Sequence, residues 1–184
     1  MGLRKASAYS RKPVVPYTRT SKRKGKAYVK VVPASKIVKF TMGNEAWFKQ
    51  GKLPYQLTVT STEKIQVRDH ALEACRQYMN KQLDKALLDK YLFKIIPYPH
   101  HIQRENKMLT GAGADRMSTG MQLSFGKSVG RSALMKPGRE LFFFAVLNEA
   151  GVAMVRKVLR EIRPKLPGRI KVDLKVVPAV TPAQ

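Results

Sequence analysis

Few residues of this chain have the type and spacing that catalysis or metal binding requires. Its histidines are His70, His100 and His101, and no HxxxH spacing occurs. The twelve Asp and Glu residues are scattered, whereas a metal site needs three or four converging ligands. Cys75 is the single cysteine, which excludes an intramolecular disulfide, and its helical spacing among apolar residues favours a core position. We therefore expect no metal, no cofactor and no catalytic residue, although sequence alone leaves a nucleophile triad open.

A phosphate-binding loop is the next chemistry to consider, because residues 106–131 read NKMLTGAGADRMSTGMQLSFGKSVGR. Gly126-Lys127-Ser128 resembles the end of a P-loop, but Met121 stands where that motif needs a glycine. GAGADR also fails the dinucleotide pattern, because Arg116 occupies the place of the third glycine. These departures argue against a nucleotide-hydrolysing site.

The same segment has the composition of a contact surface. It contains five glycines, four basic residues and one acid. Glycine permits positive φ and a close approach of the backbone to another surface, and compact domains seldom keep so long a connection without a use. We expect a loop over 103–131 that presses against an anionic surface; a merely mobile loop is the alternative.

Charge is the strongest signal in the sequence. Lys and Arg total 36 against 12 Asp and Glu, a net charge of +24. Such a chain calls for a polyanion, with nucleic acid first and an anionic membrane surface second. The longest apolar run, Leu141–Leu147, is far shorter than the roughly 20 residues of a membrane span. We therefore expect the partner to be a nucleic acid and not a membrane.

The basic residues gather in three places: an N-terminal arm, the glycine-rich segment and a C-terminal helix with its flank. Residues 1–44 hold no acid, and Pro13, Pro16 and Pro33 argue against a helix there. We interpret residues 1–35 as an extended arm that orders on its partner; a solvated tail is the alternative. The arm's candidate RNA-binding residues are Arg4, Lys5, Arg11, Lys12, Arg19, Lys22, Arg23, Lys24 and Lys26. The third cluster comprises Arg156, Lys157, Arg160, Arg163, Lys165 and Arg169.

Hydrophobic periodicity predicts the elements that position these residues. Two helices are expected, one N-capped by Asp69 and one by Asn148. Their apolar stripes are Leu72, Cys75, Met79, Leu83 and Ala86 in the first, and Val152, Val155, Leu159 and Ile162 in the second. Strands are expected at Lys36–Met42, Tyr55–Thr60, Tyr91–Ile96, Glu140–Leu147 and Ile170–Val177, with a short one around Met121–Phe125.

This order of elements predicts an α+β fold with one mostly antiparallel sheet and two helices packed on one face. The single domain would cover residues 36–177, between the arm and a frayed tail at 178–184. Phe142, Phe143 and Phe144 are expected in its core.

Long motifs of the chain also resemble a known family. NKMLTGAGADRMSTGM, followed by FGKSVG, is similar to the signature loop of the universal L-sixteen family of large-subunit ribosomal proteins, called L-ten-e in archaea and eukaryotes. MGLRKASAYSRK, DHALEACRQYMNK, FKIIPYPHHIQRENKML and RPKLPGRIKV occur in the family's order, so the resemblance covers nearly the whole chain.

The resemblance implies an α/β hammerhead-like fold and a structural, non-enzymatic role in the cytoplasmic ribosome, not as a homo-oligomer. The implied partners are large-subunit ribosomal RNA near the peptidyl-transferase centre, the 5S RNA region and neighbouring ribosomal proteins. Arg11, Arg19, Arg104 and Arg169 match family basic positions that face RNA. The loop that would approach bound tRNA comprises Asn106, Lys107, Met108, Gly111, Gly113, Ala114, Asp115, Arg116, Gly120, Gly126 and Lys127.

Two other functions remain open at this point. A nonspecific nucleic-acid-packing protein would share the charge and lack a preference for folded RNA. A small RNA-modifying or nucleotide-using enzyme would need a converging set of catalytic residues, which the sequence does not present.

Overall fold

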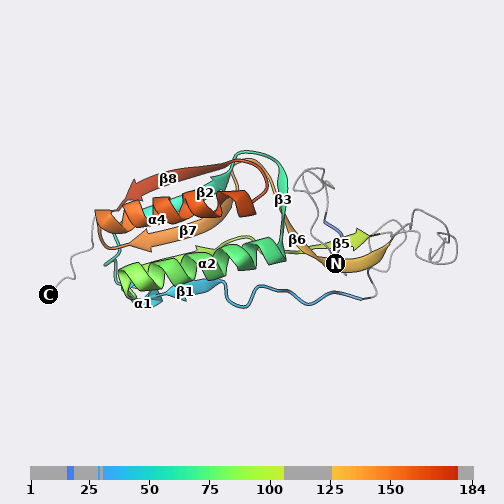
Figure 1. The fold of residues 1–184 in the computed structure, drawn as a ribbon, viewed down its shortest axis with the longest axis horizontal. Coiled ribbons are helices and arrows are strands. Elements are labelled where there is room, and N and C mark those ends of the chain that lie inside the picture. Colours follow the sequence, from blue (N-terminus) through green and yellow to red (C-terminus); the bar gives the residue numbers. More distant parts are fainter. Residues whose placement is uncertain (1–15, 19–28, 30, 106–125, 178–184) are drawn as a thin grey trace.

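The computed structural model describes residues 16–18, 29, 31–105 and 126–177 (Figure 1). The fold is α+β with antiparallel strand pairs, as predicted, but the strands form two sheets instead of one. The larger sheet has the order β1-β4-β7-β2-β8. Its strands are β1 (Thr41–Gly43), β4 (Tyr91–Ile95), β7 (Glu140–Val146), β2 (Tyr55–Ser61) and β8 (Ile170–Val176). Four of these match predicted strands to within a residue.

The smaller sheet has the order β3-β6-β5 and was not predicted. Its strands are β3 (Ile65–Arg68), β5 (His101–Glu105) and β6 (Lys127–Met135). The long β6 pairs with β3 near its end and with β5 over its first half, down to the pair Glu105 and Lys127. Figure 1 shows β5 and β6 reaching beyond the helices. Residues 103–105 and 127–131 of the expected loop are therefore strand, and the expected strand at Met121–Phe125 lies outside the described residues.

Two long helices, α2 (Asp69–Leu87) and α4 (Glu149–Ile162), lie on the same face of the larger sheet (Figure 1). Directly paired residues share a sheet face, so Leu57, Phe144 and Phe93 form one row beneath the helices. The Phe93 and Phe144 rings stack with centroids 4.7 Å apart. All three side chains are almost completely buried, and each contributes about 1.5–3 kcal/mol by leaving water.

Most of the apolar stripe predicted for α2 is confirmed. Leu72, Cys75, Met79 and Leu83 are buried, while Ala86 in the last turn is exposed. Asp69 is the first helical residue, and Arg68 occupies the N-cap position, so the predicted cap is wrong by one residue. The carboxylate of Asp69 instead accepts hydrogen bonds from the backbone N–H groups of His70 and Lys36.

The strand predicted at Lys36–Met42 is wrong over its first five residues, since β1 begins at Thr41. The backbone N–H of Lys36 donates to Asp69 Oδ2 at 3.2 Å, and that of Val38 donates to Glu73 Oε2 at 3.3 Å. Carboxylates of α2 thus bind amides that a neighbouring strand would otherwise bind.

The stripe predicted for α4 is confirmed in full, since Val152, Val155, Leu159 and Ile162 are buried, and Val158 joins them. Asn148 occupies the N-cap position, as predicted, without a side-chain capping hydrogen bond. A 3-10 turn, η3 (Arg163–Lys165), follows the helix directly. Because the apolar stripe of α4 is buried, the basic side chains of this helix point away from the core.

The opposite face of the larger sheet is covered in part by α1 (Glu45–Lys49), a short helix that was not predicted. Its Trp47 and Phe48 pack with Phe143 against a second apolar cluster of Leu53, Leu92 and Ala145. Phe142 and Phe144 therefore face the main core as predicted, whereas Phe143 is half-buried against this smaller cluster, so the predicted core position is confirmed for it only in part.

Candidate nucleic-acid interface

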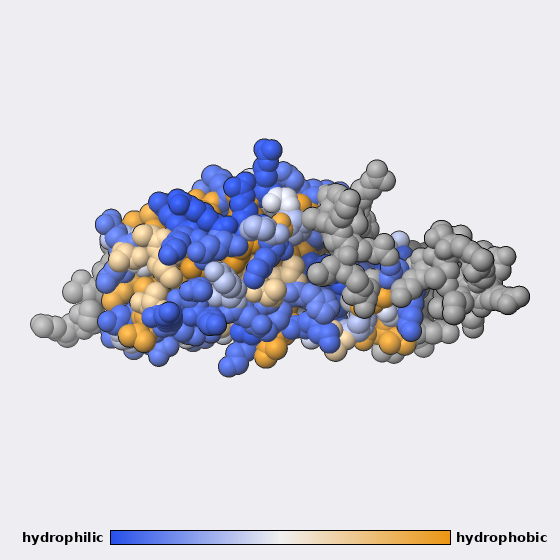
Figure 2. All heavy atoms as spheres, viewed as in Figure 1, coloured by the Kyte–Doolittle hydropathy of each residue, from blue (hydrophilic) through white to orange (hydrophobic). Residues whose placement is uncertain are grey.

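The third basic cluster forms a continuous exposed surface on α4 and the segment after it. Arg156, Lys157 and Arg160 are exposed on the helix, and Arg163 and Lys165 extend the surface through η3. Over α4, the face shown in Figure 2 carries hydrophilic side chains interspersed with apolar ones. An amphipathic helix with cations opposite its apolar stripe presents them without disturbing the core.

Lys165 is oriented by a contact between the two long helices. Its Nζ lies 4.7 Å from the centroid of the Tyr78 ring on α2. The Tyr78 hydroxyl donates to Glu161 Oε2 on α4 at 2.8 Å, and this hydrogen bond raises the pKa of Tyr78. The Tyr78 ring thus holds the ammonium group of Lys165 at the edge of the cluster, where a phosphate could reach it.

Arg169 lies in a turn whose backbone is fixed. Its carbonyl accepts hydrogen bonds from the N–H and the hydroxyl of Thr62, each at 3.1 Å. The preceding Gly168 has φ +77°, and a Cβ there would lie 2.7 Å from Ile65 Cγ2, so only glycine fits. The guanidinium is 81% exposed, and its 3.8 Å contact with Glu63 is a surface ion pair of small energetic value. Arg169 thus has a fixed backbone and an accessible side chain.

Arg104 packs against an aromatic ring of the arm. It lies in β5, and its guanidinium carbon is 3.8 Å from the centroid of the Tyr17 ring. Two hydrogen bonds also hold Tyr17 to β5. Its N–H donates to His101 Nδ1 at 3.0 Å, and its carbonyl accepts from the N–H of Ile102 at 2.9 Å. Arg104 therefore takes part in an intramolecular contact with the arm.

Sequence reasoning missed a further arm contact made by Arg131 in β6. Its Nε donates to the carbonyl of Pro33 at 2.6 Å, and its Nη1 donates to the Tyr98 hydroxyl at 3.2 Å. Nothing in the local sequence marks this arginine as different from its basic neighbours. The contact joins residues 98 positions apart and becomes visible only in the fold.

Two of the expected tRNA-proximal residues lie at the tip of the β5–β6 hairpin. Gly126 has φ +80° and leads directly into β6, where Lys127 is exposed and pairs with Glu105. The segment 106–125 therefore starts and ends at adjacent strand ends. The other loop candidates lie outside the described residues: Asn106, Lys107, Met108, Gly111, Gly113, Ala114, Asp115, Arg116 and Gly120. The arm candidates Arg4, Lys5, Arg11, Lys12, Arg19, Lys22, Arg23, Lys24 and Lys26 also lie outside them.

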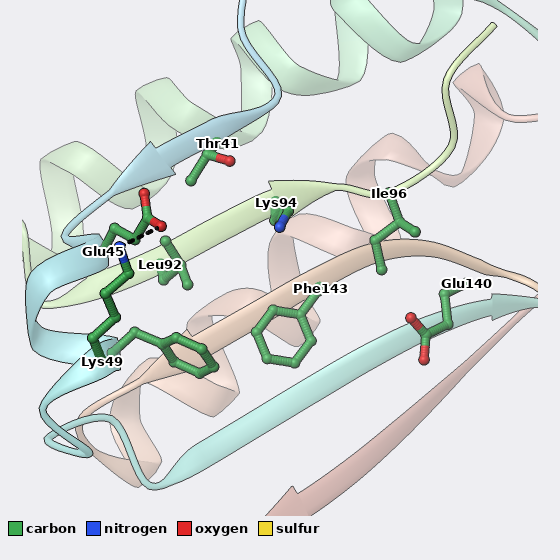
Figure 3. Close-up of a pocket in the computed structure, with 9 residues that line it drawn as sticks. Thr41, Glu45, Lys49, Leu92, Lys94, Ile96, Glu140 and Phe143 are labelled. Carbon is green, nitrogen blue, oxygen red and sulfur yellow. Dashed lines mark ion pairs between the residues drawn. The ribbon is translucent and has the colours of Figure 1, made fainter. Parts of the chain in front are cut away.

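A groove of about 540 Å³ lies on the sheet face opposite the long helices (Figure 3). Phe48 and Phe143 meet edge to face in it at 5.6 Å, and Lys94 points into it. Glu45, paired with Lys49 at 3.2 Å, and Glu140 line it as well. Two carboxylates beside two ammonium groups leave no net positive charge, so this groove is poorly suited to a phosphate group.

The residues that the structure describes contain neither a candidate metal site nor a candidate membrane-spanning helix. These residues contain no group of three or more His, Cys, Asp or Glu side chains able to hold a metal ion. No helix within residues 31–105 and 126–177 is long and apolar enough to cross a membrane.

Known proteins match the chain over most of its length. A family model described as Ribosomal protein L16p/L10e matches residues 15–173. The large ribosomal subunit protein uL16 of Sulfolobus acidocaldarius is 36% identical over 186 residues, covering 100% of both chains. Proteins of the same name from Methanococcus maripaludis (42% identical; 94% of each chain) and Thermoplasma acidophilum (38% identical; 91% of this chain and 89% of the relative) agree. The full-length agreement in sequence, together with the resemblance of the loop motif, means that the chain belongs to the ribosomal protein L16p/L10e family.

Proposed function

We propose that the protein is a structural, non-enzymatic constituent of the large ribosomal subunit and binds large-subunit ribosomal RNA in the cytoplasm. The observation that carries this proposal is its similarity over the full chain to proteins named large ribosomal subunit protein uL16. The net charge of +24 and the exposed basic surface on α4 fit a protein that lies against RNA.

The basic surface would supply affinity through phosphate contacts. Arg156, Lys157, Arg160 and Arg163 are exposed along one side of α4 and η3. Cations that neutralise phosphates release counterions, and this favours binding without reading sequence. Specificity would then come from the shape of the folded RNA and from its unpaired regions.

We infer a position for the protein in the subunit from the resemblance of its loop. The β5–β6 hairpin would carry residues 106–125 toward bound tRNA near the peptidyl-transferase centre, with the 5S RNA region nearby. Supporting this proposal, Glu105 and Lys127 pair at the hairpin tip, so both ends of the segment are fixed by the smaller sheet. Neighbouring ribosomal proteins would be further partners, and the protein would act as a single copy.

Subunit incorporation tests the proposal. A tagged copy of the chain is expressed in its source cells, and the lysate is sedimented through sucrose at increasing salt. We expect the protein to sediment with the large subunit and to be released only at high salt, because charged contacts weaken as salt rises. A protein found only at the top of the gradient, or spread over DNA-containing fractions, would contradict the proposal.

A matched pair of charge variants makes the test more specific. Replacing Arg156, Lys157 and Arg160 with alanine removes three exposed cations from α4, and replacing Lys81, Lys85 and Lys90 removes three exposed cations in and just beyond α2. We expect the α4 variant to leave the subunit at a lower salt concentration than the α2 variant. Equal release would mean that net charge alone, and no defined surface, holds the protein.

A further inference from the structure

The geometry points to Tyr17 as a positioning residue: a cradle on β5, made by His101, Ile102 and Arg104, holds it and fixes where the basic arm leaves the domain. This inference rests on the proposed RNA-binding function for its consequence, but the cradle itself can be tested without RNA. It assigns Arg104 to holding the arm, where the family resemblance implied a direct RNA contact.

The backbone of Tyr17 makes one strand-like hydrogen bond to the backbone of β5 and one hydrogen bond to a β5 side chain. Its N–H donates to His101 Nδ1 at 3.0 Å, and its carbonyl accepts from the N–H of Ile102 at 2.9 Å. Within the residues that the structure describes, β5 is an edge strand of the smaller sheet, and Tyr17 binds its outer edge. Exposed strand edges readily accept extended chain in this way.

Two side chains of β5 contact the ring of Tyr17. The guanidinium carbon of Arg104 is 3.8 Å from the ring centroid, and the His101 ring lies at 5.6 Å with an interplanar angle of 33°. His101 is only 6% exposed, so the acceptor of the Tyr17 amide is rigid and protected. A guanidinium over an aromatic face is attracted by the ring, more strongly where water is partly excluded.

The chain is also attached after the basic residues that follow Tyr17. The carbonyl of Pro33 accepts from Arg131, and the amides of Lys36 and Val38 donate to Asp69 and Glu73. The candidate RNA-binding residues Arg19, Lys22, Arg23, Lys24 and Lys26 lie between Tyr17 and Pro33 in the sequence. A segment attached at both ends loses less entropy on binding than one attached at a single end, so the cradle should strengthen RNA binding without itself contacting RNA.

Hydrogen exchange tests the cradle on the pure protein. Tyr17→Ala removes the ring, and we expect the Ile102 amide to exchange at least about tenfold faster, because its acceptor is no longer held. Tyr17→Phe keeps the ring and should retain protection. The melting temperature should not change in either variant, since Tyr17 lies outside the apolar core. Unchanged protection of Ile102 in Tyr17→Ala would overturn the inference.

Binding to a large-subunit RNA fragment then separates the two roles of Arg104. If Arg104 acts through Tyr17, Tyr17→Ala and Arg104→Ala should each weaken binding by about two- to thirtyfold, the range of a cation–π contact. The double variant should be no weaker than either single variant, and the dependence on salt should stay the same for Tyr17→Ala.

A direct phosphate contact by Arg104 would give the opposite pattern. Arg104→Ala would then lower the salt slope by about one, Tyr17→Ala would leave the affinity unchanged, and the inference would be overturned. Failure of the proposed function is distinguishable, because the unmodified protein would then show no preference for RNA, whatever the exchange of Ile102.

Discussion

At the residue scale, the chain's acids serve to organise the fold. Glu73, one of the twelve acids, is nearly buried and accepts hydrogen bonds from Arg76 Nε (2.8 Å) and Nη2 (2.6 Å), from Gln77 and from the Val38 amide. Asp69 binds the Lys36 amide one turn earlier. In a molecule of net charge +24, these two carboxylates hold the backbone of residues 36–38, which joins the arm to the domain, against α2.

The pH dependence of stability should reflect Glu73. Its hydrogen bonds with Arg76 lower the pKa of the carboxyl below 4.5, although burial opposes that shift. A carboxyl whose pKa is lower in the folded state stabilises the fold fully above its unfolded pKa, and this stabilisation is lost as the pH falls through the folded pKa. We predict that the unfolding free energy of the native protein exceeds that of Glu73→Gln most at about pH 6, and that the difference shrinks toward about pH 3.

Urea unfolding at a series of pH values measures this difference. Glu45→Gln is a suitable control, because Glu45 is exposed in a surface pair with Lys49. It should change stability little at any pH. A Glu73→Gln difference that stays constant from neutral to acid pH would contradict the role assigned to the carboxylate.

Cys75 should be chemically inert in the folded protein. It is completely buried in α2, and burial raises the pKa of its thiol to about 12, although the charge of Lys165 opposes the shift. The thiolate is the reactive species, so iodoacetamide at about pH 8 should leave the native chain unmodified and label it after denaturation. Mass spectrometry detects the added group on this single cysteine. Labelling of the native chain at the rate of the denatured chain would refute the buried position.

Much at this scale was predictable from local pattern. The core position of Cys75 followed from its spacing with Leu72 and Met79. The partner of Arg104 did not, because a basic residue in a basic chain gives no sign that an aromatic ring 87 positions earlier in the sequence lies over it. The candidate residues of the arm and of 106–125 stay predictions.

At the element scale, α4 joins the core to the candidate interface. Its apolar stripe is buried against the sheet while Arg156, Lys157 and Arg160 face outward. Removing a core side chain should therefore lower the stability of the fold without removing a surface cation, and removing a surface cation should weaken RNA binding with little effect on stability.

We predict that Leu159→Ala lowers the unfolding free energy by roughly 2–5 kcal/mol, since Leu159 is 3% exposed and the substitution leaves a cavity. Arg156→Ala, on the same helix, should change it by at most about 0.5 kcal/mol. Denaturant titration of both variants provides the comparison. Equal effects of the two substitutions would mean that the stripe is not the buried face.

The elements that sequence reasoning missed are those fixed by distant partners. Much of β5 and β6 looked like loop because glycines and charges interrupt the apolar pattern. In the fold, β6 pairs with β5 over its first half and with β3 near its end, and these pairings make it a strand of nine residues. Residues 36–40 were predicted as strand, but two carboxylates of α2 bind the amides of Lys36 and Val38. The strands β2, β4, β7 and β8 were predictable because their own side chains fill or line the core.

At the scale of the whole molecule, the acidic and the basic residues have different roles. Acidic residues bind the chain to itself at Glu73, Asp69 and Glu161, and the exposed cations of α4, η3 and Arg169 remain available on the surface. A polyanion is required to offset the self-repulsion of +24, and the proposed ribosomal RNA supplies it. We propose that phosphate contacts give the protein its affinity for RNA and that the folded shape of the RNA gives specificity.

The most direct test is a binding titration of the pure, full-length protein at several salt concentrations. One ligand is a folded large-subunit RNA fragment, and the other is random duplex DNA of equal charge. We predict that binding to both weakens steeply as salt rises, with the RNA bound much more tightly at every concentration. Equal affinity for the two at all salt concentrations would contradict the claim and would mean that the protein is a nonspecific polycation.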